Sequence, residues 1–361
     1  MLSDAMRLYD IATRLQVYTE GVKAHEAAEF NKIMFEIGKD LQKHFSNLRY
    51  SNLDALTKVQ LNQLLRAVRK SQSKIFSKYA EQLGDNLKAF MSADLELSRR
   101  VWVSAFNETD EKTRIYSNAE AIEEIESGAF FAVPLFGKAS VTGNDDRLWS
   151  QVTNAPISAN GLYLLPFIKT FTNSAQAGFE NIIRQAWANH LSVDETLALL
   201  VGDGSTVQGT VSQLRRVNVQ AGAVIETTFA HVAAIVGIAV SSALFDSYTW
   251  HSVIDGSTTE ICISRNQRTY RYGEGPIPPA HIRCRSHIAP AVPGADDIED
   301  ETFYTWVKRQ PPKVQDYVLG AAVAGKLREG ELKSKDVSKF NNPRPLTLVE
   351  FKKKIVEILS S

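Results

Sequence analysis

The sequence predicts a mostly helical protein with long N-terminal helices and a small C-terminal α+β domain, which contains a β-hairpin and a cysteine/histidine loop. Two observations predict this fold class. Apolar residues recur at steps of three and four through the first third of the chain, which is typical of amphipathic helices. Both cysteines and a cluster of prolines lie instead in one loop-rich stretch, residues 250–290.

The N-terminal region contains two runs of apolar residues with the spacing of a helical face. They are Leu8, Ile11, Leu15, Tyr18 and Val22, followed by Phe30, Ile33, Ile37 and Leu41. Asn52 and Asp54 are N-cap candidates for the next helix. Residues 71–106 contain no proline and one glycine, Gly84, so they predict an unbroken helix on the order of 50 Å long.

Charge is balanced overall but uneven along the chain. The formal net charge is zero, which argues against a protein that coats nucleic acid through bulk positive charge. Residues 39–78 are rich in Lys and Arg, and residues 108–126 are rich in Asp and Glu. These stretches are either solvated helix faces or complementary docking surfaces, and the basic one is also a candidate for DNA contact.

The middle of the chain alternates between turn-rich and helical patterns. The pattern changes over residues 128–161 to short strands or an extended connector, and a domain boundary is expected near residue 155. Ser192 and Glu195 form a capping-box pattern. The glycine-rich residues 201–210 lack the Lys-Ser/Thr pair of a phosphate-binding loop and predict a flexible connection. Residues 221–246, rich in small side chains, predict a central core helix.

The sequence predicts three consecutive domains. They are a helical N-terminal interaction region with an extended connector (1–155), a compact domain (156–291) and a helical tail (292–361). In the tail, Thr347 and Glu350 form a capping box for a last helix over residues 348–359. The apolar run 232–245 is shorter than a bilayer requires, and the N-terminus lacks a signal-peptide pattern, so we expect a cytoplasmic protein without a membrane partner.

The loop-rich stretch offers three candidate metal ligands: the sulfur atoms of Cys262 and Cys284 and the imidazole of His281. Asp255 or Glu260 could complete a tetrahedral metal site. Three states stay open from the sequence. The group is a structural metal site (zinc being the expected ion), a Cys262–Cys284 disulfide, or a pair of buried thiols that binds no cofactor. We also expect Arg283 or Arg285 to pair with a carboxylate such as Asp255.

Catalysis at this site is the competing hypothesis. A metal-dependent hydrolase or nuclease would use His281 and Asp255, but no hydrolase motif accompanies them. Pro276, Pro278 and Pro279 restrict the backbone just before His281. Such a rigid approach favours a structural cross-brace over a mobile active site.

The same stretch resembles the phage Mu F-like minor head proteins, also called phage head morphogenesis proteins. The family pattern runs from a tryptophan through an Asp, a polar pair and a Cys to Pro-Pro-x-His-x-x-Cys-Arg. The matching positions are Trp250, Asp255, Ser257, Thr258, Cys262, Pro278, Pro279, His281, Cys284, Arg285 and Ser286. The chain departs from the pattern at Glu226-Thr227, where the family tends to have Arg-Thr, and at Asn266-Gln267, where Asp-Gly often follows the first cysteine.

The tail is also similar to that of many family members, over residues 306–320 and 346–351. The resemblance implies a compact Mu F-like domain at 156–291 and a structural, non-catalytic component of a bacteriophage virion. It implies a minor capsid protein in the head interior or at the portal vertex, assembled in the host cytoplasm. The implied partners are the portal protein, the major capsid or scaffold protein and the packaged DNA, and the implied roles are head assembly, genome packaging and ejection.

Overall fold

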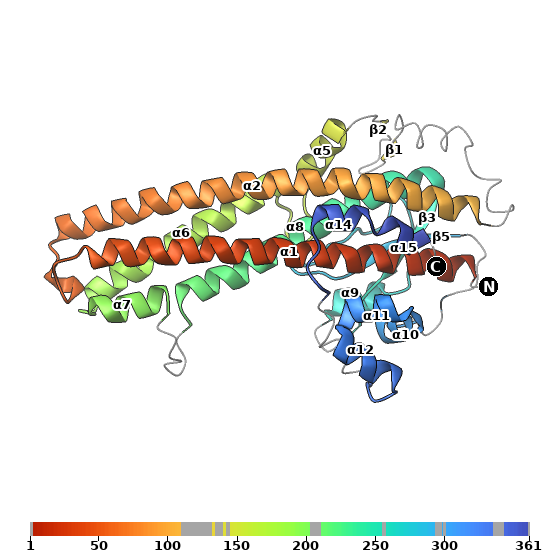
Figure 1. Cartoon of the computed structure of the whole chain (residues 1–361). Coiled ribbons are helices and arrows are strands. Elements are labelled where there is room, and N and C mark those ends of the chain that lie inside the picture. Colours follow the sequence, from red (N-terminus) through yellow and green to blue (C-terminus); the bar gives the residue numbers. More distant parts are fainter. Residues whose placement is uncertain are drawn as a thin grey trace. The chain divides into compact units, whose positions relative to one another are not determined.

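The structure, a computed structural model, describes residues 3–109, 132–133, 140–141, 145–202, 211–254, 258–292, 298, 301–334 and 343–359. The fold is mostly helical with a small three-stranded antiparallel sheet, as the sequence predicts (Figure 1). The chain forms two compact units. Unit 1 comprises Met1–His25, Leu87–Leu164 and Glu226–Ser361, and unit 2 comprises Glu26–Asn86 and Leu165–Ile225.

These units differ from the three consecutive ranges expected from the sequence, because three long helices contribute residues to both units. They are α1 (Asp4–Ser46), α2 (Lys58–Asn107) and α8 (Gln213–Leu244). The predicted unbroken helix over 71–106 is confirmed and begins earlier, at Lys58. The predicted core helix over 221–246 is confirmed as part of α8.

The start of α2 corrects one sequence prediction. Asn52 precedes a short 3-10 helix, Leu53–Ala55, and its side chain makes no capping hydrogen bond. The helix is capped instead at Thr57, whose Oγ1 accepts from the Gln60 amide at 3.3 Å while Gln60 Oε1 accepts from the Thr57 amide at 2.9 Å. This reciprocal pair satisfies two N–H groups that would otherwise lack a helical partner.

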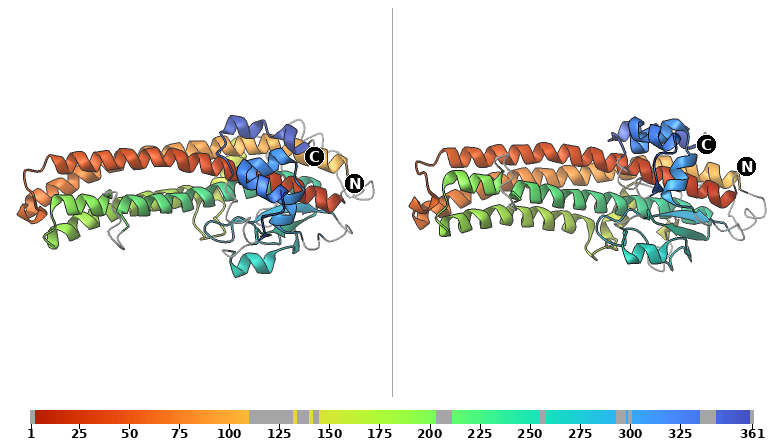
Figure 2. Two further views of the ribbon diagram at one scale, coloured as in Figure 1. Left: turned by 60° about the horizontal axis from the view of Figure 1, so that its bottom comes forward. Right: turned by 90° about the horizontal axis from the view of Figure 1, so that it is seen from below.

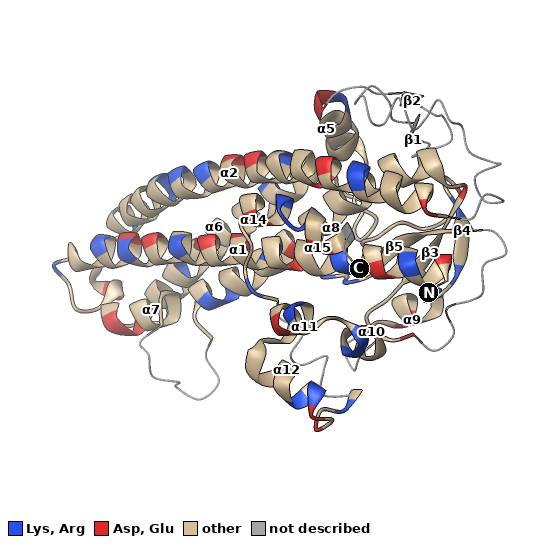
Figure 3. Ribbon diagram, turned by 45° about the vertical axis from the view of Figure 1, so that its right-hand side comes forward, with Lys and Arg blue, Asp and Glu red and all other residues tan. Residues whose placement is uncertain are grey.

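Unit 2 is helical. It combines parts of α1, α2 and α8 with α6 (Leu164–Ala188) and α7 (Val193–Leu200). Phe30 of α1 packs against Tyr79 of α2 and Phe171 of α6, with ring centroids 4.6 and 6.0 Å away. The predicted Ser192–Glu195 capping box is confirmed at the start of α7. Figure 3 shows that both signs of charge occur along α1 and α2. Most of the acidic stretch 108–126 lies outside the described residues, as do residues 203–210 of the glycine-rich loop.

The sheet of unit 1 has the strand order β4-β3-β5, from β3 (Ser247–His251), β4 (Thr269–Arg271) and β5 (His287–Ala291). β3 pairs antiparallel with β5 and with β4, and the long connection from β3 to β4 means that this pair is not the short hairpin expected after Cys262. Between these strands lies the short helix α9 (Glu260–Arg265). The two views of Figure 2 show the strands and α9 beside the C-terminal half of α8. Two further strands, β1 (Ala132–Val133) and β2 (Ser140–Val141), pair in the stretch where short strands were expected.

Long aliphatic and aromatic side chains form the remaining core of unit 1. Phe90 of α2 packs against Phe229 of α8 and Phe351, with ring centroids 5.0 and 5.4 Å away. His231 of α8 contacts the Val152 carbonyl of α5 (Asp145–Asn154) at 3.0 Å. Helix α8 is long and apolar enough to cross a membrane, but 78% of its most apolar window is buried within the protein. That environment is the one expected of a core helix.

The C-terminal helices of unit 1 are α10 (Phe303–Arg309), α11 (Pro312–Leu319), α12 (Ala321–Arg328), α14 (Leu348–Lys352) and α15 (Ile355–Leu359). The Thr347–Glu350 capping box is confirmed. The single last helix expected over 348–359 is divided in two. Hydrogen bonds from the Lys353 and Lys354 amides to the carbonyls three residues earlier tighten the backbone there.

Asp10 of α1 joins the C-terminal helices to the N-terminal one. Its Oδ1 accepts hydrogen bonds from Trp306 Nε1 at 2.9 Å, Gln310 Nε2 at 2.7 Å and Arg309 Nη1 at 3.2 Å. Its Oδ2 lies 2.9 Å from Arg14 Nε, an ion-pair contact without hydrogen-bond alignment. Asp10, Arg14, Trp306 and Gln310 are buried. We call this group the Asp10 junction.

Candidate metal centre

Three local features bring the cysteines and the histidine together. Helix α9 directs Cys262 inward, so that this side chain is 2% exposed. The connection between β4 and β5 returns past the Pro278–Pro279 pair, which is buried and joined by a cis peptide bond, to His281 and Cys284. Trp250, at 0% exposure on β3, packs against both cysteines. The sheet therefore anchors both the helix and the loop that carry the three side chains.

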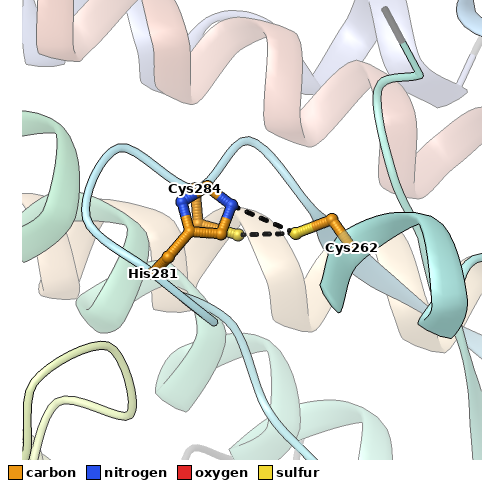
Figure 4. A group of neighbouring side chains, drawn as sticks. All are labelled: Cys262, His281 and Cys284. Carbon is orange, nitrogen blue, oxygen red and sulfur yellow. Dashed lines mark hydrogen bonds between the residues drawn. The ribbon is translucent and has the colours of Figure 1, made fainter. Parts of the chain in front are cut away.

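The three candidate ligand atoms all lie within 4.8 Å of one another. Cys262 Sγ lies 3.2 Å from His281 Nε2 and 3.8 Å from Cys284 Sγ (Figure 4). Both cysteines are free thiols, so the disulfide that the sequence left open is not formed. A Cys–His–Cys group of this kind could hold a metal ion, because thiolate sulfur and imidazole nitrogen are the ligands that zinc prefers.

The tautomer of His281 follows from its hydrogen bond to the backbone. His281 Nδ1 lies 2.8 Å from the carbonyl oxygen of Ile282. A carbonyl oxygen can only accept, so Nδ1 must carry the hydrogen. In the neutral ring Nε2 then presents its lone pair toward Cys262, which is the arrangement that metal-binding histidines use.

The pKa values of the two cysteines are shifted in opposite directions. The pKa of Cys284 is lowered to about 5, chiefly because Cys262 donates a hydrogen bond to it, with further donors in the backbone at Ser286 and Ala280. The pKa of Cys262 is raised by the same contact and by burial. The pair thus holds one negative charge more readily than two. A thiolate at this position is the form that binds a metal.

The hydroxyl groups of Ser286 and Ser252 form a chain that is hydrogen-bonded to Cys262. Ser286 Oγ lies 3.3 Å from Cys262 Sγ and 3.0 Å from Ser252 Oγ. Ser252 in turn accepts from Trp250 Nε1 at 2.9 Å and donates to the Cys262 carbonyl at 2.9 Å. Ser252 is the supporting residue that sequence reasoning missed. Its position two residues after the buried Trp250 was the available signal.

The remaining predicted site residues fall into three groups. Thr258, just before α9, donates from its hydroxyl to the Val253 carbonyl at 2.7 Å. Glu260 is exposed, and its carboxylate does not belong to the group of neighbouring ligand atoms. Asp255 and Ser257, the other polar candidates before α9, lie outside the described residues.

The arginines next to Cys284 border a hollow. Arg283 Nε lies 3.8 Å from a carboxylate oxygen of Glu226 on α8, so a glutamate is its observed ion-pair partner. The backbone of Arg283 has a φ of 63°, and its amide donates to Thr227 Oγ1 at 3.1 Å. Burial raises the pKa of Glu226, with Arg283 opposing that shift. Glu226 and Arg283, with Arg285, Ile282 and Thr259, line a hollow of about 370 Å³ that reaches Cys262 and His281.

Comparison with described protein families, curated proteins and solved structures gave no match to this chain.

Proposed function

We propose that this chain is a structural minor head protein of a tailed bacteriophage, of the Mu F-like kind, that acts at the portal vertex. The observation that carries the proposal is the convergence of the motif residues. Trp250, Cys262, His281, Cys284 and Ser286 carry the resemblance to that family, and all five lie together, with His281 half-buried and the other four buried. Residues that are separated in the sequence motif therefore share one structural task.

The second part of the resemblance supports the same proposal. The tail that is similar to that of family members begins at Trp306, and Trp306, Arg309 and Gln310 all bind Asp10 of α1. The motif and the tail thus belong to one compact unit. A domain braced at both places is suited to the mechanical role of a virion component.

In this proposal a zinc ion completes the brace. Cys262, His281 and Cys284 would supply three ligands from α9 and from the loop before β5. When bound, the ion would cross-link these two segments without a disulfide, which suits assembly in a reducing host cytoplasm. The Ile282 carbonyl orients His281, and Ser286 holds Cys262, so the ligands keep their places before the ion arrives.

The proposed partner is the phage portal protein, with the major capsid or scaffold protein and the packaged DNA as further contacts. The proposed location is the virion, in the head interior or at the portal vertex. The long helices α1 and α2 provide extended surface for such contacts. The formal net charge of zero fits a protein partner better than a general DNA coat.

Co-purification tests the proposal. The full chain is co-expressed with the portal oligomer of the phage that encodes it, and the complex is isolated through a tag on the portal. We expect the wild-type chain to be retained with the portal and to be incorporated into particles. Failure of the folded chain to bind the portal and to enter particles would refute the assignment.

Zinc content tests the brace separately. We expect about one zinc per chain by elemental analysis, and loss of zinc with lower thermal stability in His281→Gln and Cys284→Ser. His190→Gln is the matched control, because His190 is exposed and lies in unit 2. Variants that lost zinc yet kept wild-type stability and particle incorporation, while losing a hydrolytic turnover, would favour the metal-dependent hydrolase instead.

A further inference from the structure

Four exposed isoleucines lie on the segments that carry the Cys–His–Cys group, and one of them, Ile282, lines the hollow beside it. Their side chains belong to residues that are 51% (Ile263), 40% (Ile254), 39% (Ile261) and 38% (Ile282) exposed. Among the isoleucines whose side chains the structure describes, these four are the ones that are exposed. We call them the isoleucine patch. Single exposed apolar residues are ordinary, but a group on neighbouring segments of one site is typical of an interaction surface.

The contacts of the site place the patch residues near one another. Ile261 and Ile263 flank Cys262 on α9, and Ile282 follows His281, whose Nε2 lies 3.2 Å from Cys262 Sγ. Ile282 lines the hollow, as does Val253, the neighbour of Ile254. The Cys–His–Cys group therefore holds α9 and the His281 loop so that both present isoleucines outward.

The charge around the patch is positive. Arg265 closes α9, Arg268 follows it in an exposed position, and Arg283 and Arg285 line the hollow. Among the described residues of the same segments the carboxylates are fewer, with Glu226 in the hollow and Glu260 at the start of α9. An apolar patch with basic neighbours complements a partner that offers an apolar side chain between acidic residues.

We propose that the isoleucine patch and the hollow beside it form a docking site for an acidic segment of another protein, with one large apolar side chain of that segment packed against the isoleucines and its carboxylates facing Arg283 and Arg285. The hollow of about 370 Å³ is lined mostly by polar and charged side chains and has room for a carboxylate side chain. A nucleic acid is the less suitable occupant, since stacking of bases uses aromatic side chains and the patch consists of isoleucines. The proposal does not depend on a role in phage heads.

Selection from a displayed library of random dodecapeptides on the immobilised full-length chain tests the proposal. We expect the enriched peptides to carry Leu, Phe or Trp flanked by Asp and Glu. Fluorescence anisotropy with the best labelled peptide should show affinity that falls about tenfold or more in the double variant Ile261→Ser/Ile263→Ser and in Ile282→Ser. The affinity should also fall as salt is raised.

Val349→Ser/Val356→Ser is the matched control, because these valines are 64% and 70% exposed but lie on the last two helices. Circular dichroism and thermal melting confirm that each variant is folded, and Ile282→Ser serves if the α9 variant is not. The proposal is overturned if no peptide is enriched, if enriched peptides lack acidic residues, or if patch and control variants bind equally. Tighter binding of single-stranded DNA, weakened by the same patch variants, would also overturn it.

Discussion

Replacing Asp10 by Asn should destabilise unit 1 through the loss of one buried negative charge. Arg14 is 4% exposed at its side chain and pairs with the Asp10 carboxylate, whereas Arg309 is 26% exposed and keeps a second ion pair with Glu301 at 3.0 Å. Breaking a buried ion pair by removing one partner costs about 3–5 kcal/mol. Asn keeps one acceptor for Trp306 or Gln310, so we expect the lower end of that range, about 3 kcal/mol.

Urea unfolding and hydrogen exchange measure this effect. Trp306 is fully buried and donates to Asp10, so its fluorescence should report loss of the junction. The amides of α10 should exchange faster in Asp10→Asn than in the wild type. Asp316→Asn is the matched control, because Asp316 and Arg328 form a pair with side chains 41% and 37% exposed, and its effect should stay below about 1 kcal/mol. Equal destabilisation by the two variants would refute the reasoning.

Three further changes test other parts of the structure. Burial raises the pKa of Asp94, which lies beside a cavity of about 60 Å³, to about 7. The folded state therefore holds a proton that the unfolded state loses near pH 4. As the pH rises from 4 to 7, the free energy of unfolding should fall by up to about 4 kcal/mol in the wild type but not in Asp94→Asn. Melting curves across this range check it, and parallel pH profiles would count against it. Burial, with His287 as a smaller cause, holds the pKa of His251 well below 6.5. The stability that comes from the neutral His251 should therefore be fully present above pH 6.5 and decline as the pH falls below it, less steeply in His251→Gln. Identical loss of stability at acid pH in the two proteins would contradict this. Thr57→Ala should lower the free energy of unfolding by about 1 kcal/mol through loss of the α2 cap, whereas Asn52→Ala should change it little. Chemical denaturation of the two variants measures both effects. A larger loss in Asn52→Ala would support the cap at Asn52 that the sequence predicted.

Short-range patterns made the helices predictable. The period of apolar residues identified the long helices, and the capping boxes at Ser192 and Thr347 were visible because each involves residues three apart. The cap predicted at Asn52 was wrong, because Asn52 forms an isolated β-bridge with Ser192 instead of capping α2. A capping residue is recognised only when the point at which the chain enters the helix is known, and that point depends on distant contacts.

The candidate metal centre was predictable in its ligands but not in its supports. Cys262, His281 and Cys284 were visible as residue types with suitable spacing. The partner of Arg283 was not, because Glu226 lies on a core helix far away in the sequence. The Asp10 junction gave no local signal either, since an aspartate on a helix face reads as a solvated charge until its partners are known.

Asp10 and Gln310 are 300 positions apart, and this separation has a consequence for synthesis on the ribosome. The first turns of α1 emerge early, carrying an aspartate and an arginine whose buried surroundings are not yet translated. They can be enclosed only after α10 has left the exit tunnel. A prematurely terminated chain would therefore expose the apolar face of α1 together with its stranded charges, and should be recognised by chaperones and proteases in preference to the finished protein.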